Sequence, residues 1–327
     1  MNSRQRAGIT ATLPVEVIFA AGMAPVDLNN VFITSPDAAG MIDRAEHAGI
    51  PQSTCAWIKG IYIAAREMAI TRVVGVTGGD CTNTRALLEI LESEGIETSD
   101  FSYPYPADKA AMQKEIERFC SLFDTDLSAA EEVRLKLQPV RRLAAEIDRL
   151  TWDGSRVTGA ENHRFQVSMS DFESDYIAYA EKLRKFIDSA ESRPVREGPR
   201  IGLLGVPPIL TDLHDYIENL GAVVVFNEFQ RQFAMPYPAE SLSEQYTAYT
   251  YPYTTSQRMD DAGKEISRRG IDGIVNYVQN FCWRQLTDKL VRDALNVPVL
   301  TLQADKPGVV SGPVATRIEA FVEMLQD

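Results

Sequence analysis

Three of the four cysteines in this sequence occupy positions that favour metal chemistry. Cys81 and Cys282 each follow a predicted β-strand and precede a helical pattern, and Cys55 stands directly before another helical run. Helix starts carry unpaired N–H groups and partial positive charge, which lower the pKa of a thiol and stabilise its thiolate. Because open α/β sheets bind ligands at the carboxyl ends of their strands, we expect these cysteines to form a cysteine-ligated centre.

Three thiolates without a fourth ligand are typical of an iron–sulfur cubane with one accessible iron. Zinc held by three cysteines and water is the competing metal. The sequence has no CxxC pair, and its three histidines, His47, His163 and His214, form no HExxH pattern. The fourth cysteine, Cys120, lies in the middle of a predicted helix on an apolar stripe, so we expect it in the core.

Other candidate residues surround these cysteines. Gly78-Gly79 belongs to no phosphate-binding pattern, and we expect Gly79 to let the backbone approach a cluster closely; an ordinary tight turn is the alternative. His163 and Glu228 follow predicted strands or turns and are candidate catalytic proton donors, with a structural polar role as the alternative. The tyrosine-rich segment Tyr246–Tyr253 either lines a pocket or packs in a core.

The elements that must position these residues alternate between strand and helix, which predicts an α/β fold with two doubly wound lobes of parallel sheet joined by a helical segment. The predicted strands are Val15–Ala21, Arg72–Thr77, Ile96–Tyr103, Ile201–Val206, Ala222–Asn227, Gly273–Val278 and Val297–Gln303. The predicted helices are Ala56–Met68, Thr82–Glu94, Ala107–Leu150, Leu210–Leu220, Ser256–Arg269, Trp283–Leu295 and Thr316–Gln326.

Local signals add helix starts and domain boundaries. Ser128 with Glu131 fits a capping box, and Ser170 with Glu173 fits another that opens a helix reaching Ala190. The segment 192–199 contains two prolines and a glycine and is expected to be a connector. We therefore expect an N-terminal lobe over residues 1–157 with Cys55 and Cys81, a helical connector over 158–199, and a C-terminal lobe over 200–327 with Cys282.

Composition excludes several classes of function. The 33 basic and 46 acidic residues give a formal net charge of −13, which argues against binding to nucleic acid. Hydrophobic residues make up 45% of the chain, so a substantial core is expected. No apolar run reaches the roughly 18 residues that a membrane span needs, and the apolar stretch near the N-terminus is too short for a signal peptide. We expect a cytoplasmic protein.

The order of four motifs resembles the 2-hydroxyacyl-CoA dehydratase and benzoyl-CoA reductase superfamily. These motifs are Gly49-Ile-Pro-Gln-Ser-Thr-Cys55-Ala-Trp-Ile-Lys59, Val74-Gly-Val-Thr-Gly-Gly-Asp-Cys81, Gln279-Asn-Phe-Cys282-Trp-Arg-Gln285 and Thr316-Arg-Ile-Glu-Ala-Phe-Val-Glu323. The closest resemblance is to the stand-alone double-cubane cluster proteins. It rests on Gly159-Ala-Glu-Asn-His163, Val167-Ser-Met-Ser-Asp171, Gly205-Val-Pro-Pro208 and Phe226-Asn-Glu-Phe-Gln-Arg-Gln-Phe233, and on the short chain.

The resemblance implies that Cys55, Cys81 and Cys282 hold iron. We also expect Gly79 and Gln279 to lie next to the cluster. The cluster is either an [8Fe–9S] double cubane shared across a homodimer or one [4Fe–4S] cubane per chain. The resemblance also implies a separate ATP-hydrolysing iron–sulfur activator, and no ATP-binding motif occurs in this chain. The leading expectation is low-potential reduction of a small molecule. The alternatives are radical dehydration as a 2-hydroxyacyl-CoA dehydratase subunit and non-catalytic electron transfer.

Overall fold

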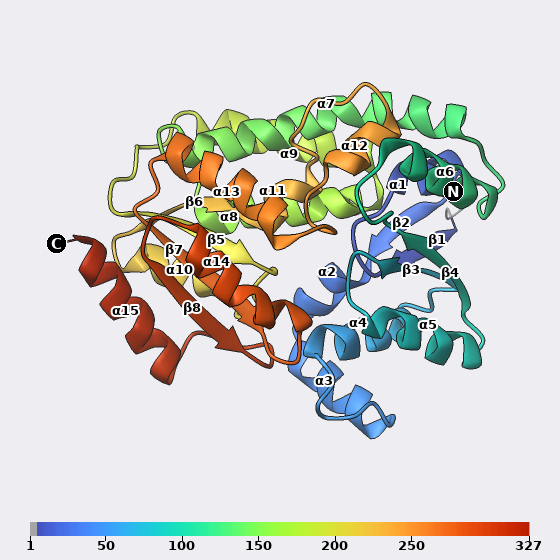
Figure 1. Cartoon of the computed structure of the whole chain (residues 1–327), viewed down its shortest axis with the longest axis horizontal. Helices are drawn as coiled ribbons and strands as arrows, with labels where there is room; N and C mark the ends of the chain where they lie inside the picture. The colour runs from blue at the N-terminus through green and yellow to red at the C-terminus, as the bar shows by residue number, and fades with distance from the viewer. Residues whose placement is uncertain (1–4, 327) are drawn as a thin grey trace. The chain divides into compact units, whose positions relative to one another are not determined.

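The computed structural model describes residues 5–326, which form two compact units (Figure 1). The first unit comprises the chain up to Arg142 together with Ser168–Ala180 and Met235–Tyr253. The second comprises Leu143–Val167, Glu181–Ala234 and the chain from Thr254 onward. Each unit is therefore discontinuous, whereas the sequence prediction gave one continuous range to each lobe. The difference arises because the short segments 168–180 and 235–253 pack with the first unit.

A four-stranded parallel sheet forms the centre of the first unit, in the order β2-β1-β3-β4. Its strands are β1 (Arg6–Ile9), β2 (Ala24–Asp27), β3 (Arg72–Gly78) and β4 (Glu97–Ser102). Its helical elements are α1 (Val15–Ala20), α2 (Leu28–Ile33), α3 (Ala38–His47), α4 (Ala56–Glu67), α5 (Asn83–Ser93), α6 (Lys109–Ser121), η1 (Ser168–Ser170), η2 (Phe172–Ser174) and α12 (Leu242–Ala248). The boundary between the units falls within two further helices, α7 (Leu127–Trp152) and α9 (Tyr176–Ala190).

The second unit repeats the same strand order, β6-β5-β7-β8, and is again parallel throughout. Its strands are β5 (Arg200–Gly205), β6 (Val223–Asn227), β7 (Gly273–Gln279) and β8 (Val299–Ala304). Its helical elements are α8 (Gly159–Val167), α10 (Leu213–Asn219), α11 (Glu228–Phe233), α13 (Thr255–Arg269), η3 (Trp283–Thr287), α14 (Asp288–Ala294) and α15 (Gly312–Gln326). The predicted fold class, two doubly wound parallel lobes, is confirmed.

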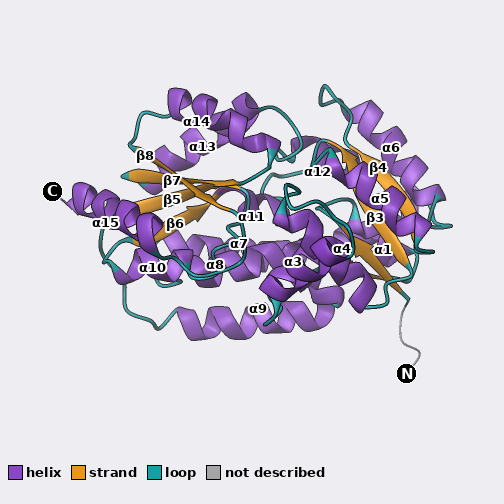
Figure 2. Cartoon of the chain, turned by 90° about the horizontal axis from the view of Figure 1, so that it is seen from below, coloured by secondary structure: helices purple, strands orange, loops and turns teal. Residues whose placement is uncertain are grey.

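Helices cover both faces of this second sheet (Figure 2). Because side chains alternate along a strand, Leu203 faces α10 and α15 while its neighbour Leu204 faces α13 and α14. The two hydrophobic clusters that result leave no face of the sheet open, as expected of a parallel sheet. The carboxyl ends of the strands are then the natural place for a ligand.

The prediction at the N-terminus was wrong. Val15–Ala20 forms the helix α1, not a strand, although its β-branched residues favour a strand. Every residue from Val15 to Phe19 is buried, including Glu16, so the segment shows no periodicity from which the two structures could be told apart. The real strands nearby, β1 and β2, have four residues each, and β2 contains Pro25, which an edge strand tolerates.

Three details within the predicted helices also need correction. The expected helix over Ala107–Leu150 is two helices, α6 and α7, and Asp126, not Ser128, caps α7 by accepting a hydrogen bond from the Ala129 amide. The helix α9 starts at Tyr176, after Asp175 has accepted hydrogen bonds from two amides of its first turn. The expected capping residue Ser170 instead donates to Asp27.

Candidate functional site

Cys55 and Cys81 lie at the same edge of the first sheet. Cys55 is the buried N-cap residue of α4, the helix that precedes β3 and returns the chain to the start of that strand. Cys81 follows the carboxyl end of β3. A 12-residue helix rises about 18 Å, which is enough to return the start of α4 to the carboxyl edge of a seven-residue strand. The topology therefore places both thiols at the carboxyl edge of the sheet, next to the N-terminal ends of α4 and α5.

An aromatic segment fixes the loop that carries Cys81. Gly79 has φ +89°, and a Cβ on it would lie 2.6 Å from the Pro252 side chain and 3.0 Å from that of Tyr103. The Tyr251 hydroxyl donates to Asp80 Oδ1 at 3.1 Å. The close approach observed at Gly79 is thus to the protein itself, and its predicted proximity to a cluster stays a prediction. The tyrosine-rich segment packs in a core, where Tyr246, Tyr249 and Tyr253 are buried.

A buried lysine holds the loop that leads to Cys55. The side chain of Lys59 is 3% exposed, and its Nζ donates to Glu46 Oε1 at 2.7 Å and to the Gln52 carbonyl at 2.8 Å. A buried ammonium requires such partners because its desolvation is costly. Lys59 therefore ties the segment before Cys55 to the helix that follows it.

Cys282 occupies the equivalent place in the second unit. It is the third residue after Gln279, the last residue of β7, as Cys81 is the third after Gly78, the last residue of β3. Cys282 is the N-cap residue of η3 and is partly exposed, as Cys81 is. The preceding Phe281 has φ +61°, a left-handed conformation that a phenylalanine rarely adopts.

A pocket of about 280 Å³, counting the part open to solvent, lies at the carboxyl edge of this second sheet. Gly205, Asn276 and Gln279 line it from the strands, Phe229 and Arg258 from the helices α11 and α13. Arg284 lines it from η3, two residues after Cys282. The pocket and the Cys282 loop thus share one edge.

Two predicted residues, Glu228 and Gln279, are engaged in hydrogen bonds around this pocket. Glu228 accepts from Arg258 Nε and Nη2 at 2.7 and 2.9 Å and from the Gly205 amide at 3.1 Å. Gln279 accepts from the Tyr277 hydroxyl at 2.6 Å and donates to the Asp305 carbonyl at 2.8 Å. In all three contacts the carboxylate oxygens of Glu228 accept from N–H donors. Its catalytic role and the contact of Gln279 with a cluster stay predictions.

His163 packs against a second histidine at the carboxyl end of β6. The ring centroids of His163 and His214 are 4.7 Å apart, and Gln230 lies 3.0 Å from His163 Nδ1. Burial, the neighbouring His214 and Arg164 hold the pKa of His163 well below its ordinary value. Burial also lowers the pKa of His214 to about 4, although its hydrogen bond with Asn227 acts in the opposite direction. His163 is therefore neutral at pH 7, and its role as a proton donor stays a prediction.

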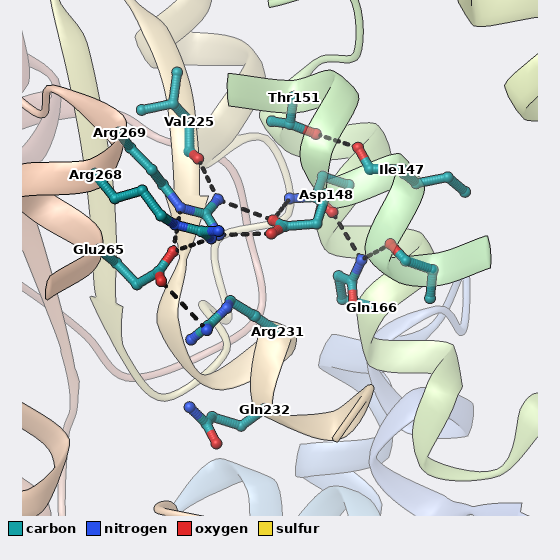
Figure 3. A network of polar contacts seen from close by, with 12 residues as sticks. Ile147, Asp148, Thr151, Gln166, Val225, Arg231, Gln232, Glu265, Arg268 and Arg269 are labelled. Atoms are coloured by element: carbon teal, nitrogen blue, oxygen red, sulfur yellow. Dashed lines mark hydrogen bonds and ion pairs between the residues drawn. The ribbon is translucent and has the colours of Figure 1, made fainter. Parts of the chain in front are cut away.

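A network of buried charges holds α7, α8, α13 and β6 together (Figure 3). Arg269 is fully buried and donates to both carboxylate oxygens of Asp148, to Glu265 and to the Val225 carbonyl. Asp148 also accepts from Asn162, the residue before His163. Burial disfavours a charged Asp148, but Arg269 outweighs this, and the pKa of Asp148 is lowered. The network fixes the helix that carries His163.

Sequence reasoning missed the charged residues of the second unit. The helical segments around three arginines are rich in charge, which predicts a solvent-exposed face. Each of these arginines is nevertheless at most 8% exposed: Arg258, Arg269 and Arg284. Only tertiary packing identifies them. Cys120, in contrast, is buried as predicted, and burial raises the pKa of its thiol to about 11, although it lies near the C-terminal end of α6 rather than in mid-helix.

The three cysteines are chemically suited to an iron–sulfur cluster. Cysteine thiolates at helix starts suit iron and sulfide, because the first backbone N–H groups of a helix have no partner within it and can donate hydrogen bonds to sulfur. Cys55 and Cys81 belong to the first unit and Cys282 to the second. Across residues 5–326, no cluster of three or more His, Cys, Asp or Glu side chains forms a ready metal site.

A family model described as "2-hydroxyglutaryl-CoA dehydratase, D-component" matches residues 10–325. The chain belongs to this family. The match covers the three cysteines and both sheets, and it confirms the superfamily resemblance drawn from the motifs. This D-component family member is a component of the 2-hydroxyacyl-CoA dehydratase type.

The other comparisons add little to this assignment. No curated protein matches the chain significantly. Among solved structures, the SBP FpvC from Pseudomonas aeruginosa in complex with Mn²⁺ is 13% identical over 99% of both chains, with a TM-score of 0.26, a likeness too weak to support any conclusion. Between residues 5 and 326, no helix of this D-component family member is long and apolar enough to cross a membrane.

Proposed function

We propose that this D-component family member holds an iron–sulfur cluster through Cys55, Cys81 and Cys282. The observation that carries the proposal is the equivalence of Cys81 and Cys282, each three residues beyond the corresponding strand of two sheets with the same order. Cys55 adds a third thiol at the edge where Cys81 lies. Family membership supports iron over zinc.

The cluster is either an [8Fe–9S] double cubane shared by two chains or one [4Fe–4S] cubane per chain. Three cysteines per chain supply six ligands when two chains meet, so the double cubane requires a homodimer. Two-fold pairing is also the commonest symmetry among soluble oligomers. Light scattering of the iron-loaded protein under anaerobic conditions tests this. A strictly monomeric loaded protein removes the shared cluster and leaves the single cubane.

The proposed reaction is low-potential reduction of a small molecule, with electrons from a separate ATP-hydrolysing activator. When bound, the cluster would store the electrons that the activator delivers and would offer an accessible iron. The pocket beside Cys282, with its buried polar lining, favours an enzyme over a simple electron carrier. Reduction is followed by electron paramagnetic resonance with activator, reductant and ATP. Equal reduction without ATP or activator contradicts the proposal and indicates a carrier.

Radical dehydration of a 2-hydroxyacyl-CoA is the second candidate, and the chain's membership of the 2-hydroxyglutaryl-CoA dehydratase D-component family favours it. In that case the chain works as one subunit of a pair. Affinity purification under anaerobic conditions separates the two candidates: a longer second subunit that copurifies at equal amounts supports dehydration, and a homodimer without one supports reduction.

The ligand assignment is tested by iron and sulfide counts on anaerobically purified variants. Replacing Cys55, Cys81 or Cys282 with serine should remove most of the bound iron, because serine is a poor ligand for these centres. Cys120→Ser is the matched control and should keep its iron. If the Cys120 variant loses iron while the Cys81 variant keeps it, the assignment is wrong.

A further inference from the structure

The outer edge of β2 is covered by side chains instead of another strand. β2 pairs with β1 alone and lies at the edge of the first sheet. The Ser174 hydroxyl donates to the Pro25 carbonyl at 2.7 Å, and Asp171 Oδ2 accepts from the Asp27 amide at 2.8 Å. The edge segment, residues 170–174, thus binds backbone groups that an edge strand otherwise leaves open.

The edge segment is held in a strained conformation. Phe172, Glu173 and Ser174 have φ angles of 54°, 50° and 66°, so three consecutive residues other than glycine are left-handed. Such a run persists only where the surrounding contacts enforce it, because L-residues clash with their own backbone in this region. Phe172 is the anchor, since it is fully buried and packs edge-on to Phe19 at 6.2 Å between ring centroids. The strain favours release once the other contacts weaken.

Two buried carboxyl groups meet where the edge segment docks. Asp27 and Asp171 are 5% and 6% exposed, and within residues 5–326 neither forms an ion pair with an arginine or lysine. Asp27 accepts from the Ser170 hydroxyl and from both the amide and the side chain of Asn29. Among the described residues, Asp171 accepts from two backbone amides, those of Asp27 and Glu173. The donors therefore favour an ionised Asp27 and leave the proton on Asp171.

Burial and neighbouring negative charge act together on this pair. Burial, and then the charges of Asp27 and Glu173, raise the pKa of Asp171 to about 7. Burial also raises the pKa of Asp27, although hydrogen bonds from Ser170 and Asn29 act in the opposite direction. The two carboxyl groups therefore hold about one proton between them near neutral pH.

The elements packed around the pair supply little positive charge. α2 has no ionisable side chain, and the one on α1, Glu16, is paired with Arg141 of α7. The guanidinium carbon of Arg141 lies 5.4 Å from the ring centroid of Phe172 in the edge segment. From α9, Tyr179 stays neutral because burial raises its pKa, and the exposed Asp175 adds negative charge. A second ionised carboxylate at this edge is therefore unfavourable.

We propose that the edge segment is a proton-operated latch, docked on β2 while Asp27 and Asp171 share one proton and released when both are ionised. Release hydrates both charges and relaxes the left-handed residues. A solvated aspartate has a pKa of about 3.9, so docking weakens as the pH rises from about 4 towards 7 and levels off above it. The edge segment connects α8 to α9, so the latch controls how firmly this connection is held on the first sheet. The latch involves no cysteine and needs no iron.

Hydrogen–deuterium exchange of the purified chain, measured on peptides that cover the edge segment and β2, tests the proposal. Protection factors, corrected for the pH dependence of chemical exchange, should fall about tenfold from pH 6 to pH 8. Asp171→Asn keeps one acceptor oxygen but has no titrating carboxyl, so its protection should differ less than about twofold between these pH values. Asp188→Asn is the control, because it removes an exposed carboxylate from α9 and should keep the tenfold fall.

Asp27→Asn is the second variant and decides if Asp171→Asn does not fold. It removes the main repulsive charge, so the fall in protection should move to lower pH and become smaller between pH 6 and pH 8. Peptides from β5 and β7 are the internal reference and should keep their protection. Three results overturn the inference: wild-type protection that does not fall, a variant at Asp171 or Asp27 that falls as the wild type does, or an equal fall in the reference peptides.

Discussion

Arg269→Met probes the buried charge network that positions α8. The substitution keeps most of the side-chain volume but removes the guanidinium that contacts Asp148, Glu265 and the Val225 carbonyl. Glu265 keeps ion pairs with Arg231 and Arg268. Among the described residues, Asp148 is left with the side-chain amide of Asn162 as its hydrogen-bond partner. The variant therefore creates one buried carboxylate without an ion-pair partner in direct contact, although the charge of Arg231 still acts on it from further away.

The expected cost follows from that uncompensated charge. Breaking a buried ion pair from one side costs about 3–5 kcal/mol, and an orphaned buried carbonyl adds up to roughly 1–3 kcal/mol. These contributions overlap because the surrounding structure relaxes, so we expect the free energy of unfolding to fall by about 4 kcal/mol. Such a loss is a large part of the ~5–15 kcal/mol that stabilises a typical domain.

Urea unfolding measures the loss in the unit that contains the network. Trp152 is a local fluorescence probe, because the guanidinium of Arg268 lies 4.8 Å from its ring centroid. The other two tryptophans, Trp57 and Trp283, are replaced by phenylalanine in every variant. Arg149→Met on α7 is the control, since this exposed arginine also makes two ion pairs but should cost under about 1 kcal/mol.

The double variant Arg269→Met with Asp148→Leu separates the charge effect from the packing effect. It removes both partners, so it should regain most of the loss and come within about 2 kcal/mol of wild type. A single variant that loses less than about 1 kcal/mol refutes the reasoning. So does a double variant that is no more stable than the single one, because the cost would then lie in packing.

Three further predictions concern individual side chains. The pKa of His214 is about 4 in the folded protein and about 6.5 in the unfolded chain, so the free energy of unfolding falls as the pH drops from 6.5 towards 4. In urea unfolding, His214→Gln should reduce the stability lost between pH 7.5 and pH 5 by about 2 kcal/mol. An unchanged loss contradicts this prediction. Lys59→Met should speed alkylation of the buried Cys55 several-fold, because the Gln52 carbonyl loses its hydrogen-bond donor and the loop before Cys55 loosens. Peptide mass mapping measures the rate, with Cys120 as the internal standard. Equal alkylation rates of Cys55 in the variant and the wild type would count against this prediction. Tyr251→Phe should cost about 1 kcal/mol, because the hydrogen bond to Asp80 is lost; no measurable change would show that solvent replaces it.

Much of the architecture was predictable because its signals are local. The strands β3 and β5 to β8 are apolar runs between turn residues, and α5, α10 and α13 have the 3.6-residue periodicity of amphipathic helices. Cys81 and Cys282 could be singled out because a strand, a turn and a helix start all lie within a few residues of each. The helix α1 failed because a wholly buried segment has no polar face to reveal its period.

The polar interior was decided by tertiary structure alone. Arg258 and Arg269 belong to one helix, α13, whose sequence reads as a charged and solvated surface. Both are buried because partners from other elements meet them, Glu228 at the start of α11 and Asp148 on α7. Burying a guanidinium is unfavourable unless a carboxylate compensates it, and such a partner lies 30 residues away in one case and 121 in the other. A local sequence pattern cannot predict an ion pair between residues so far apart in the sequence, because the two side chains meet only when the chain has folded.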